Sequence, residues 1–154
     1  MIDAPEIAET KAQPAAVIHF DIPRHEMMAV FGPAVEELLG ALGAQGIKPL
    51  SAAFAHHLKM SPERFNFELG FVTEKPVEAA GRVKPGDLPA RKVARTIYHG
   101  PYEGLPSAWG EFDKWMKAQG LKQADDLWEV YTHGPQSDPD PKKWWTELVR
   151  PLVG

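Results

Sequence analysis

The sequence predicts an α+β domain built from two tandem strand–helix–strand–strand units, with two main helices packed on an antiparallel sheet. Three observations predict it. Segments that alternate apolar and polar residues are interrupted by two segments with helical periodicity. The order strand, helix, strand, strand occurs twice, in half-repeats at about residues 16–73 and 88–153 of one domain that spans residues 1–154. Short sequence matches also recur in the same order in both halves.

The first half-repeat begins after residues 1–14, a polar, proline-containing stretch that we expect to form a loose arm. Residues 16–22 are predicted to be a strand. A helix is expected to begin near Pro33, because proline is favoured in a first turn, and to stop at Gly46. Its predicted buried face consists of residues at helical spacing: Val35, Leu38, Leu39 and Leu42.

Two strands complete this half. Residues 50–58 are small and apolar, and residues 64–71 alternate strictly, so that four residues share a face: Phe65, Phe67, Leu69 and Phe71. Residues 60–63 are a predicted turn between the two strands. Residues 74–88 are rich in proline and glycine and are expected to be a surface connector.

The second half-repeat has the same order. A strand is predicted at residues 91–98 and a helix from about Tyr102 to Gly120. The apolar stripe of that helix is Leu105, Trp109, Phe112, Trp115 and Met116. Residues 126–131 form the next predicted strand, closed by Gly134-Pro135. After a turn at residues 136–141, a last strand is expected at residues 144–149, ending at Pro151.

Three matches relate the two halves. Gly32-Pro33 and Gly100-Pro101 stand at the expected helix starts, and Ala-Gln-Gly closes both helices at residues 44–46 and 118–120. Residues 67–69 (Phe-Glu-Leu) correspond to residues 146–148 (Thr-Glu-Leu). A duplication explains all three matches with one event.

Composition narrows the function classes. The chain has 154 residues and a net charge of −4 without a long basic run, which argues against nucleic acid as a partner. It contains no cysteine, so disulfides and thiolate sites are excluded. The N-terminus lacks the apolar segment of a signal peptide, and no apolar run is long enough to span a bilayer. We therefore expect a cytoplasmic protein that has no membrane partner.

Glu129 interrupts the apolar strand at residues 126–131. Strand alternation places it on one face with Leu127 and Tyr131, and places Trp128 and Val130 on the other. Such a carboxylate either lies on an exposed surface or faces a group that needs negative charge.

Several motifs resemble the GyrI-like effector-binding domain, which also forms the C-terminal half of many AraC-type and MerR-type transcription regulators. They are residues 99–105 (HGPYEGL), Ala108-Trp109, the Trp-Glu-Val-Tyr strand at residues 128–131, Thr146-Glu147-Leu148 and Pro151-Leu152. The resemblance covers residues 16–153. It implies a duplicated fold with pseudo-two-fold symmetry and a small-molecule ligand in a cleft where the two units meet. It also implies that Glu129 lies among aromatic side chains and attracts lipophilic cations.

The expected site follows from this resemblance. Its centre is Glu129 with Tyr131, and the other expected ligand-binding residues are Tyr98, Trp109, Trp145, Glu147 and Phe54. The first half-repeat contains no tryptophan or tyrosine. Its contribution to the binding site would therefore come from phenylalanine or histidine. Only about fifteen residues precede the first predicted strand, and we expect no helix-turn-helix within them.

Three functions are open. The preferred one is binding of a lipophilic or cationic small molecule for sensing, sequestration or detoxification. The second is hydrolysis of strained electrophiles, with Glu129 as general base and Tyr131 orienting the substrate. The third is a protein-interaction role, because the namesake of the family is similar to an inhibitor of DNA gyrase. The sequence does not identify the ligand or the oligomeric state.

No cofactor or metal is expected. His56 and His57 are adjacent on a predicted strand and point apart, and His99 and His133 lack companions at ligand spacing. Surface or turn positions are expected for the histidines.

Overall fold

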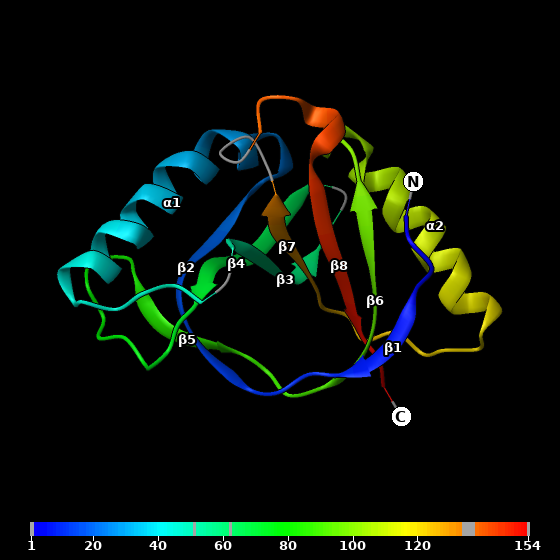
Figure 1. The fold of residues 1–154 in the computed structure, drawn as a ribbon, viewed down its shortest axis with the longest axis horizontal. Coiled ribbons are helices and arrows are strands. Elements are labelled where there is room, and N and C mark those ends of the chain that lie inside the picture. The colour runs from blue at the N-terminus through cyan, green and yellow to red at the C-terminus, as the bar shows by residue number, and fades with distance from the viewer. Residues whose placement is uncertain (1, 51, 62, 134–137, 154) are drawn as a thin grey trace. The chain divides into compact units, whose positions relative to one another are not determined.

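The computed structural model describes residues 2–50, 52–61, 63–133 and 138–153. The chain divides into unit 1, formed by residues 1–10 and 91–154, and unit 2, formed by residues 11–90. In each unit the described strands form four antiparallel neighbours that carry one long helix (Figure 1). The α+β class is therefore confirmed, and the pseudo-two-fold relation between the halves stays a prediction. The expected Gly134-Pro135 stop lies outside the described residues.

In unit 2 the strand order is β3-β4-β2-β5. The strands are β2 (Gln13–Pro23), β3 (Phe54–Met60), β4 (Arg64–Val72) and β5 (Lys84–Leu88). A 3-10 turn, η1 (Arg24–Glu26), leads into helix α1 (Met27–Ala44), which packs on β2 and β4. The helix buries Ala34, Val35, Leu38 and Leu42, and Phe67 and Leu69 of β4 are also fully buried. Burial of this apolar stripe is the main source of the stability of the helix.

Two expectations about α1 are wrong. The helix begins at Met27, and Pro33 lies exposed inside it, so Gly32-Pro33 does not mark a helix start. Proline removes one backbone donor from a helix, yet α1 continues through Pro33 to Ala44, and the buried residues Ala34 and Val35 follow it directly. Leu39 is 42% exposed and does not belong to the buried face.

Two outer strands were not predicted from the sequence. The expected loose arm contains β1 (Glu6–Glu9), which pairs with β6 (Lys92–His99) of unit 1, and the start of β2. The expected connector contains β5, which pairs with β2. Both strands are polar and occupy an edge, where one row of backbone groups stays unpaired and proline is tolerated, so neither shows the alternation of a half-buried strand. Leu50 is 62% exposed, and β3 begins at Phe54 rather than there.

In unit 1 the strand order is β1-β6-β8-β7. The strands after β1 are β6 (Lys92–His99), β7 (Leu127–His133) and β8 (Trp145–Pro151). The 3-10 turn η2 (Tyr102–Gly104) precedes helix α2 (Leu105–Ala118), and η3 (Pro141–Lys143) precedes β8. Strand β8 thus begins one residue later than expected, because Trp144 caps η3.

The predicted stripe of α2 is confirmed. Phe112, Met116 and Ala108 are buried against β6 and β8. The partly buried residues that pack at the margin of this cluster include Leu105, Trp109 and Trp115 of the same helix. Both helices also end as predicted. Gly46 and Gly120 follow the C-cap glutamines with φ values of 67° and 69°, a left-handed conformation that glycine adopts without strain.

Candidate ligand-binding site

Glu129 lies on the face of the unit 1 sheet that α2 covers. Its partner across the β7–β8 ladder is Leu148, and Leu148 packs against Phe112 and Met116 of α2. Because residues that pair directly project to the same face, the glutamate side chain projects toward the helix. Only 7% of Glu129 is exposed. The choice left open by the sequence is therefore decided: this carboxylate is buried.

Neutral donors from α2 and β7 bind the carboxylate of Glu129. The indole Nε1–H of Trp109, on α2, donates to Glu129 Oε2 at 2.7 Å. The hydroxyl of Tyr131, two residues along β7, donates to Oε1 at 2.7 Å. Burial raises the pKa of Glu129, and these two hydrogen bonds lower it by less. The pKa of Tyr131 also rises, first because of burial and then because of the neighbouring carboxylate.

Two further aromatic rings extend this group. The ring of Tyr102 lies 5.6 Å from that of Tyr131 and 5.1 Å from that of Trp144, measured between centroids. The position of Trp144 is fixed by a hydrogen bond: its indole N–H donates to the carbonyl oxygen of Asp138 at 2.7 Å. Burial, and then the charge of Glu129, raise the pKa of Tyr102. We name the group formed by Trp109, Glu129, Tyr131, Tyr102 and Trp144 the Glu129 cluster.

A bulge in β7 shapes the cluster. Val130 pairs with Glu147, and the ladder resumes at His133 with Trp145, so two residues of β7 oppose the single residue Thr146. Tyr131 is one of the two. Bulges re-aim side chains and often lie beside functional sites.

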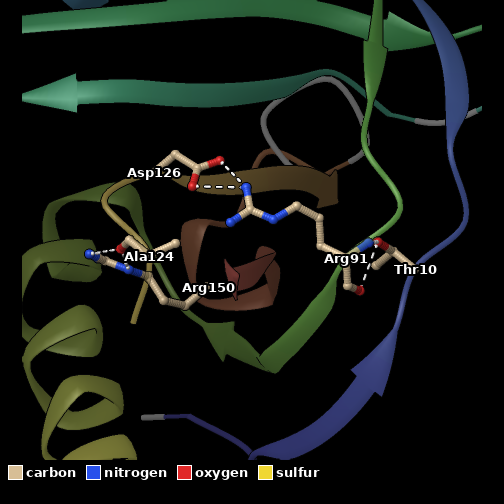
Figure 2. Close-up of polar contacts among 5 residues, drawn as sticks. All are labelled: Thr10, Arg91, Ala124, Asp126 and Arg150. Carbon is tan, nitrogen blue, oxygen red and sulfur yellow. Dashed lines mark hydrogen bonds and ion pairs between the residues drawn. The ribbon is translucent and has the colours of Figure 1, made fainter. Parts of the chain in front are cut away.

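The polar network in Figure 2 anchors the chain just before β7. Arg91 donates from one guanidinium nitrogen to both carboxylate oxygens of Asp126, each at 3.1 Å. The backbone of Arg91 is bound in turn by Thr10, whose hydroxyl accepts its N–H at 3.0 Å. Arg150 of β8 donates twice to the carbonyl oxygen of Ala124. These bonds hold residues 124–126 in place. They therefore constrain the position at which β7, the strand that carries Glu129, begins.

Tyr98 and Trp145, both expected in the site, have other surroundings. Tyr98 is 5% exposed, belongs to the apolar core under α2 and donates its hydroxyl to the Pro101 carbonyl at 2.8 Å. Trp145 is 41% exposed, and its ring lies 6.1 Å from that of His99. The neighbouring Trp144, rather than Trp145, contacts Tyr102.

Glu147 lies on the opposite face of the sheet from Glu129. It pairs with Val130, the next residue in β7, so its side chain projects away from α2. Burial raises its pKa, and Arg95 lowers it by less. Phe54 belongs to unit 2, where it is 1% exposed and pairs with Gly70 on β4. A Cβ at Gly70 would lie 3.1 Å from the Phe54 ring, so this ring fills the space above the glycine.

The sequence did not single out Tyr102 and Trp144 as site residues. Tyr102 was within reach, because it belongs to the Gly-Pro-Tyr-Glu motif that follows β6. Choosing between the adjacent tryptophans Trp144 and Trp145 depends on where β8 starts, which η3 determines.

The histidine expectation is wrong at two positions. His56 and His57 are buried in β3, at 7% and 4% exposure, rather than lying at the surface. The ring of His57 packs on Phe65 and Phe67, and burial lowers its pKa to about 4. Within the described residues, no three His, Asp or Glu side chains are grouped so that they could hold a metal ion. None of the helices in the described part of the chain has the length and hydrophobicity needed to span a bilayer.

Comparison with known proteins gives a family and a set of similar structures. The family model described as GyrI-like small molecule binding domain matches residues 3–153. No curated protein sequence matches. The EcmrR C-terminal domain superposes with a TM-score of 0.86 at 18% identity, covering 97% of each chain. In the EcmrR–DNA complex the TM-score is 0.84 at 18% identity, with 97% of this chain covered, and the chain spans only 57% of the EcmrR chain.

Two other structures share the fold. SAV2435 bound to tetraphenylphosphonium superposes with a TM-score of 0.73 at 12% identity, covering 99% of this chain and 95% of the other. A hydrolase from Listeria innocua superposes with a TM-score of 0.66 at 14% identity, covering 97% and 91%. At these identities the likeness shows the fold alone.

Proposed function

Because the chain belongs to the GyrI-like small molecule binding domain family, we propose that the small molecule it takes is a lipophilic organic cation, bound at the Glu129 cluster. The observation that carries the proposal is the buried carboxylate of Glu129, held between the indole of Trp109 and the hydroxyl of Tyr131. The donors of these two hydrogen bonds are neutral groups, and each binds a different oxygen of the carboxylate.

Electrostatics favours a cation there. A carboxylate removed from water keeps its charge at a cost, which its raised pKa reflects. A cation beside Glu129 offsets that cost, whereas a neutral ligand of the same shape does not. The aromatic faces of Tyr102 and Trp144 add cation–π attraction of about 0.5–2 kcal/mol per ring. SAV2435, which shares this fold, binds tetraphenylphosphonium, a lipophilic cation, and this supports the same ligand class here.

The test uses two probes of the same shape and opposite charge. Titration calorimetry with tetraphenylphosphonium and with tetraphenylborate compares the wild type with Glu129→Gln. We expect the wild type to bind the phosphonium and reject the borate. The substitution should weaken phosphonium binding at least tenfold, which corresponds to about 1.4 kcal/mol.

Glu147→Gln is the matched control. It removes one carboxylate from the same sheet, on the face away from α2, and should leave phosphonium binding unchanged. Equal binding of the two probes by the wild type, or equal losses in the two variants, would reject the role of Glu129.

One contact favours a second function, hydrolysis of an electrophilic small molecule. Glu129 with a raised pKa is suited to take a proton from water, and Tyr131 lies 2.7 Å away, on the same face, where its hydroxyl can orient a substrate. Incubation with an epoxide and quantification of diol product distinguishes the two functions. If the wild type forms diol and Glu129→Gln does not, the result supports hydrolysis. If the wild type binds a small molecule saturably but forms no diol, the result supports binding without catalysis.

A further inference from the structure

We propose that the hydroxyl of Thr146 is a direct hydrogen-bonding contact for the ligand, so that the site prefers lipophilic cations that carry a neutral polar group. Suitable groups include a hydroxyl or an ether oxygen. This inference rests on the proposed function, because it assigns a specificity residue to the same site.

Thr146 lies beside the Glu129 cluster. It pairs with Tyr98 on one side, and on the other side it faces the bulge of β7 that contains Tyr131. Leu148, two residues further along β8, pairs with Glu129. Thr146 therefore projects to the same face as Glu129 and is its diagonal neighbour across the ladder, at a spacing of about 7–8 Å between backbones.

The hydroxyl of Thr146 is buried and has no hydrogen-bond partner in the described structure. The residue is 0% exposed, and its Oγ1 makes no hydrogen bond. Thr96, on the same face of β6, shows the usual arrangement: it is buried, and its Oγ1 donates to the carbonyl oxygen of Asp3 at 2.7 Å. A buried hydroxyl without a partner destabilises the fold, and valine would fill the same volume without that cost. The hydroxyl thus has no structural role that the described contacts reveal.

The predicted duplication pairs Thr146 with a packed aromatic residue of unit 2, Phe67. The triplet 67–69 corresponds to 146–148, and Phe67 pairs with Phe20 as Thr146 pairs with Tyr98. Phe67 is fully buried, and its ring stacks on Phe20 at 5.4 Å between centroids. In unit 1 a small polar side chain stands where unit 2 has a packed ring. That difference favours a contact with a ligand over a role in core packing.

The chemistry of the hydroxyl defines the ligand. A threonine hydroxyl can donate one hydrogen bond and accept up to two, but it carries no charge. Glu129 supplies the charge complement, so the Thr146 contact is suited to a neutral oxygen or nitrogen on the body of the same molecule. A hydrocarbon cation would satisfy Glu129 and leave Oγ1 of Thr146 without a partner.

The experiment compares isosteric probes. The (hydroxymethylphenyl)triphenylphosphonium cation differs from (ethylphenyl)triphenylphosphonium only by a hydroxyl in place of a methyl group. Each is titrated calorimetrically as the ortho, meta and para isomer, so that the polar group is presented to Thr146 from three positions on the ring. For the wild type, at least one hydroxymethyl isomer should bind about tenfold more tightly than its ethyl counterpart.

Two variants assign that preference. Thr146→Val should abolish it and leave binding of the ethyl probes unchanged or tighter, whereas Thr146→Ser, which keeps the hydroxyl, should retain it. In the absence of ligand, Thr146→Val should melt no lower than the wild type, while Thr96→Val, which breaks the bond to Asp3, should melt lower.

The outcomes separate the two proposals. If no isomer shows a preference, or if Thr146→Val keeps one, the Thr146 contact is overturned while cation binding at Glu129 stands. If the wild type binds none of the phosphonium probes, the proposed function is overturned and the Thr146 contact with it.

Discussion

Trp109 of α2 and Glu129 of β7 are joined by a hydrogen bond of 2.7 Å between the indole nitrogen and Oε2. This bond connects the helix directly to the strand that carries the proposed site. It also explains how one side chain of an otherwise apolar helix stripe becomes a polar contact, because an indole buries a large ring and keeps one donor.

Trp109→Phe tests the contribution of this bond. The ring is largely kept, but the donor to Glu129 is lost, and hydrogen bonds to charged groups contribute about 1.5–3 kcal/mol. We expect the free energy of unfolding at neutral pH to fall by about that amount, measured by urea denaturation. Trp115→Phe is the control on the same helix, since the ring of Trp115 packs against Phe112. A loss in Trp115→Phe as large as that in Trp109→Phe would mean that ring size alone matters.

Glu129→Gln should change how stability depends on pH. Burial raises the pKa of Glu129 above its ordinary value of 4.5, so the folded protein binds this proton more tightly than the unfolded chain. The wild type should therefore lose stability as pH rises from 4.5 through the raised folded pKa, and the full penalty should be present above it. The variant lacks this contribution.

The measurement is the difference in melting temperature between Glu129→Gln and the wild type across pH 4–8. Taking the difference cancels the other titrating groups, including Glu147, whose pKa is also raised. The difference should shift in favour of the variant as pH rises. A difference that is constant with pH would show that Glu129 titrates normally.

Asp126→Asn should destabilise the protein by weakening the network before β7. Asp126 and Arg91 are only 16% and 28% exposed at their side chains, so solvent screens their attraction incompletely. The expected loss is about 1–3 kcal/mol in the free energy of unfolding, measured by chemical denaturation. Asp21→Asn is the matched control, because the Asp21–Arg64 pair is more than half exposed and should contribute less than about 1 kcal/mol. Equal losses of unfolding free energy in Asp126→Asn and Asp21→Asn would show that the network before β7 contributes no more than an exposed ion pair.

Gly104→Ala should destabilise the turn that leads into α2. A Cβ at Gly104 would lie 2.0 Å from the Tyr98 hydroxyl and 2.9 Å from the adjacent ring carbon, and that hydroxyl is already bound to Pro101. Overpacking of this kind costs about 1–3 kcal/mol. Gly110→Ala, within α2, has open space around the new methyl group and should instead stabilise the helix by up to about 1 kcal/mol. Thermal melts of the two variants should therefore move in opposite directions.

Local sequence patterns were enough to predict the long central strands and the C-terminal ends of both helices. The alternation in β4 and the stripe of α2 reflect burial on one face, which any sequence must encode at a period of two or 3.6. The Ala-Gln-Gly ends were equally readable, since the left-handed position after each helix strongly favours glycine. The polar edge strands β1 and β5 were missed because their pairing comes from neighbouring backbones and leaves no periodic signal in their own residues.

By itself, the sequence determined that a charged residue, Glu129, interrupts an apolar strand, and that Tyr131 shares its face. Only the tertiary structure decided what surrounds that charge. Helix packing brought Trp109 to Oε2 of Glu129, and strand register placed Glu147 on the opposite face and Thr146 on the same face as Glu129. The reason is physical: alternation along one strand sets which side chains share a face, but which groups meet across faces depends on register and packing between distant segments.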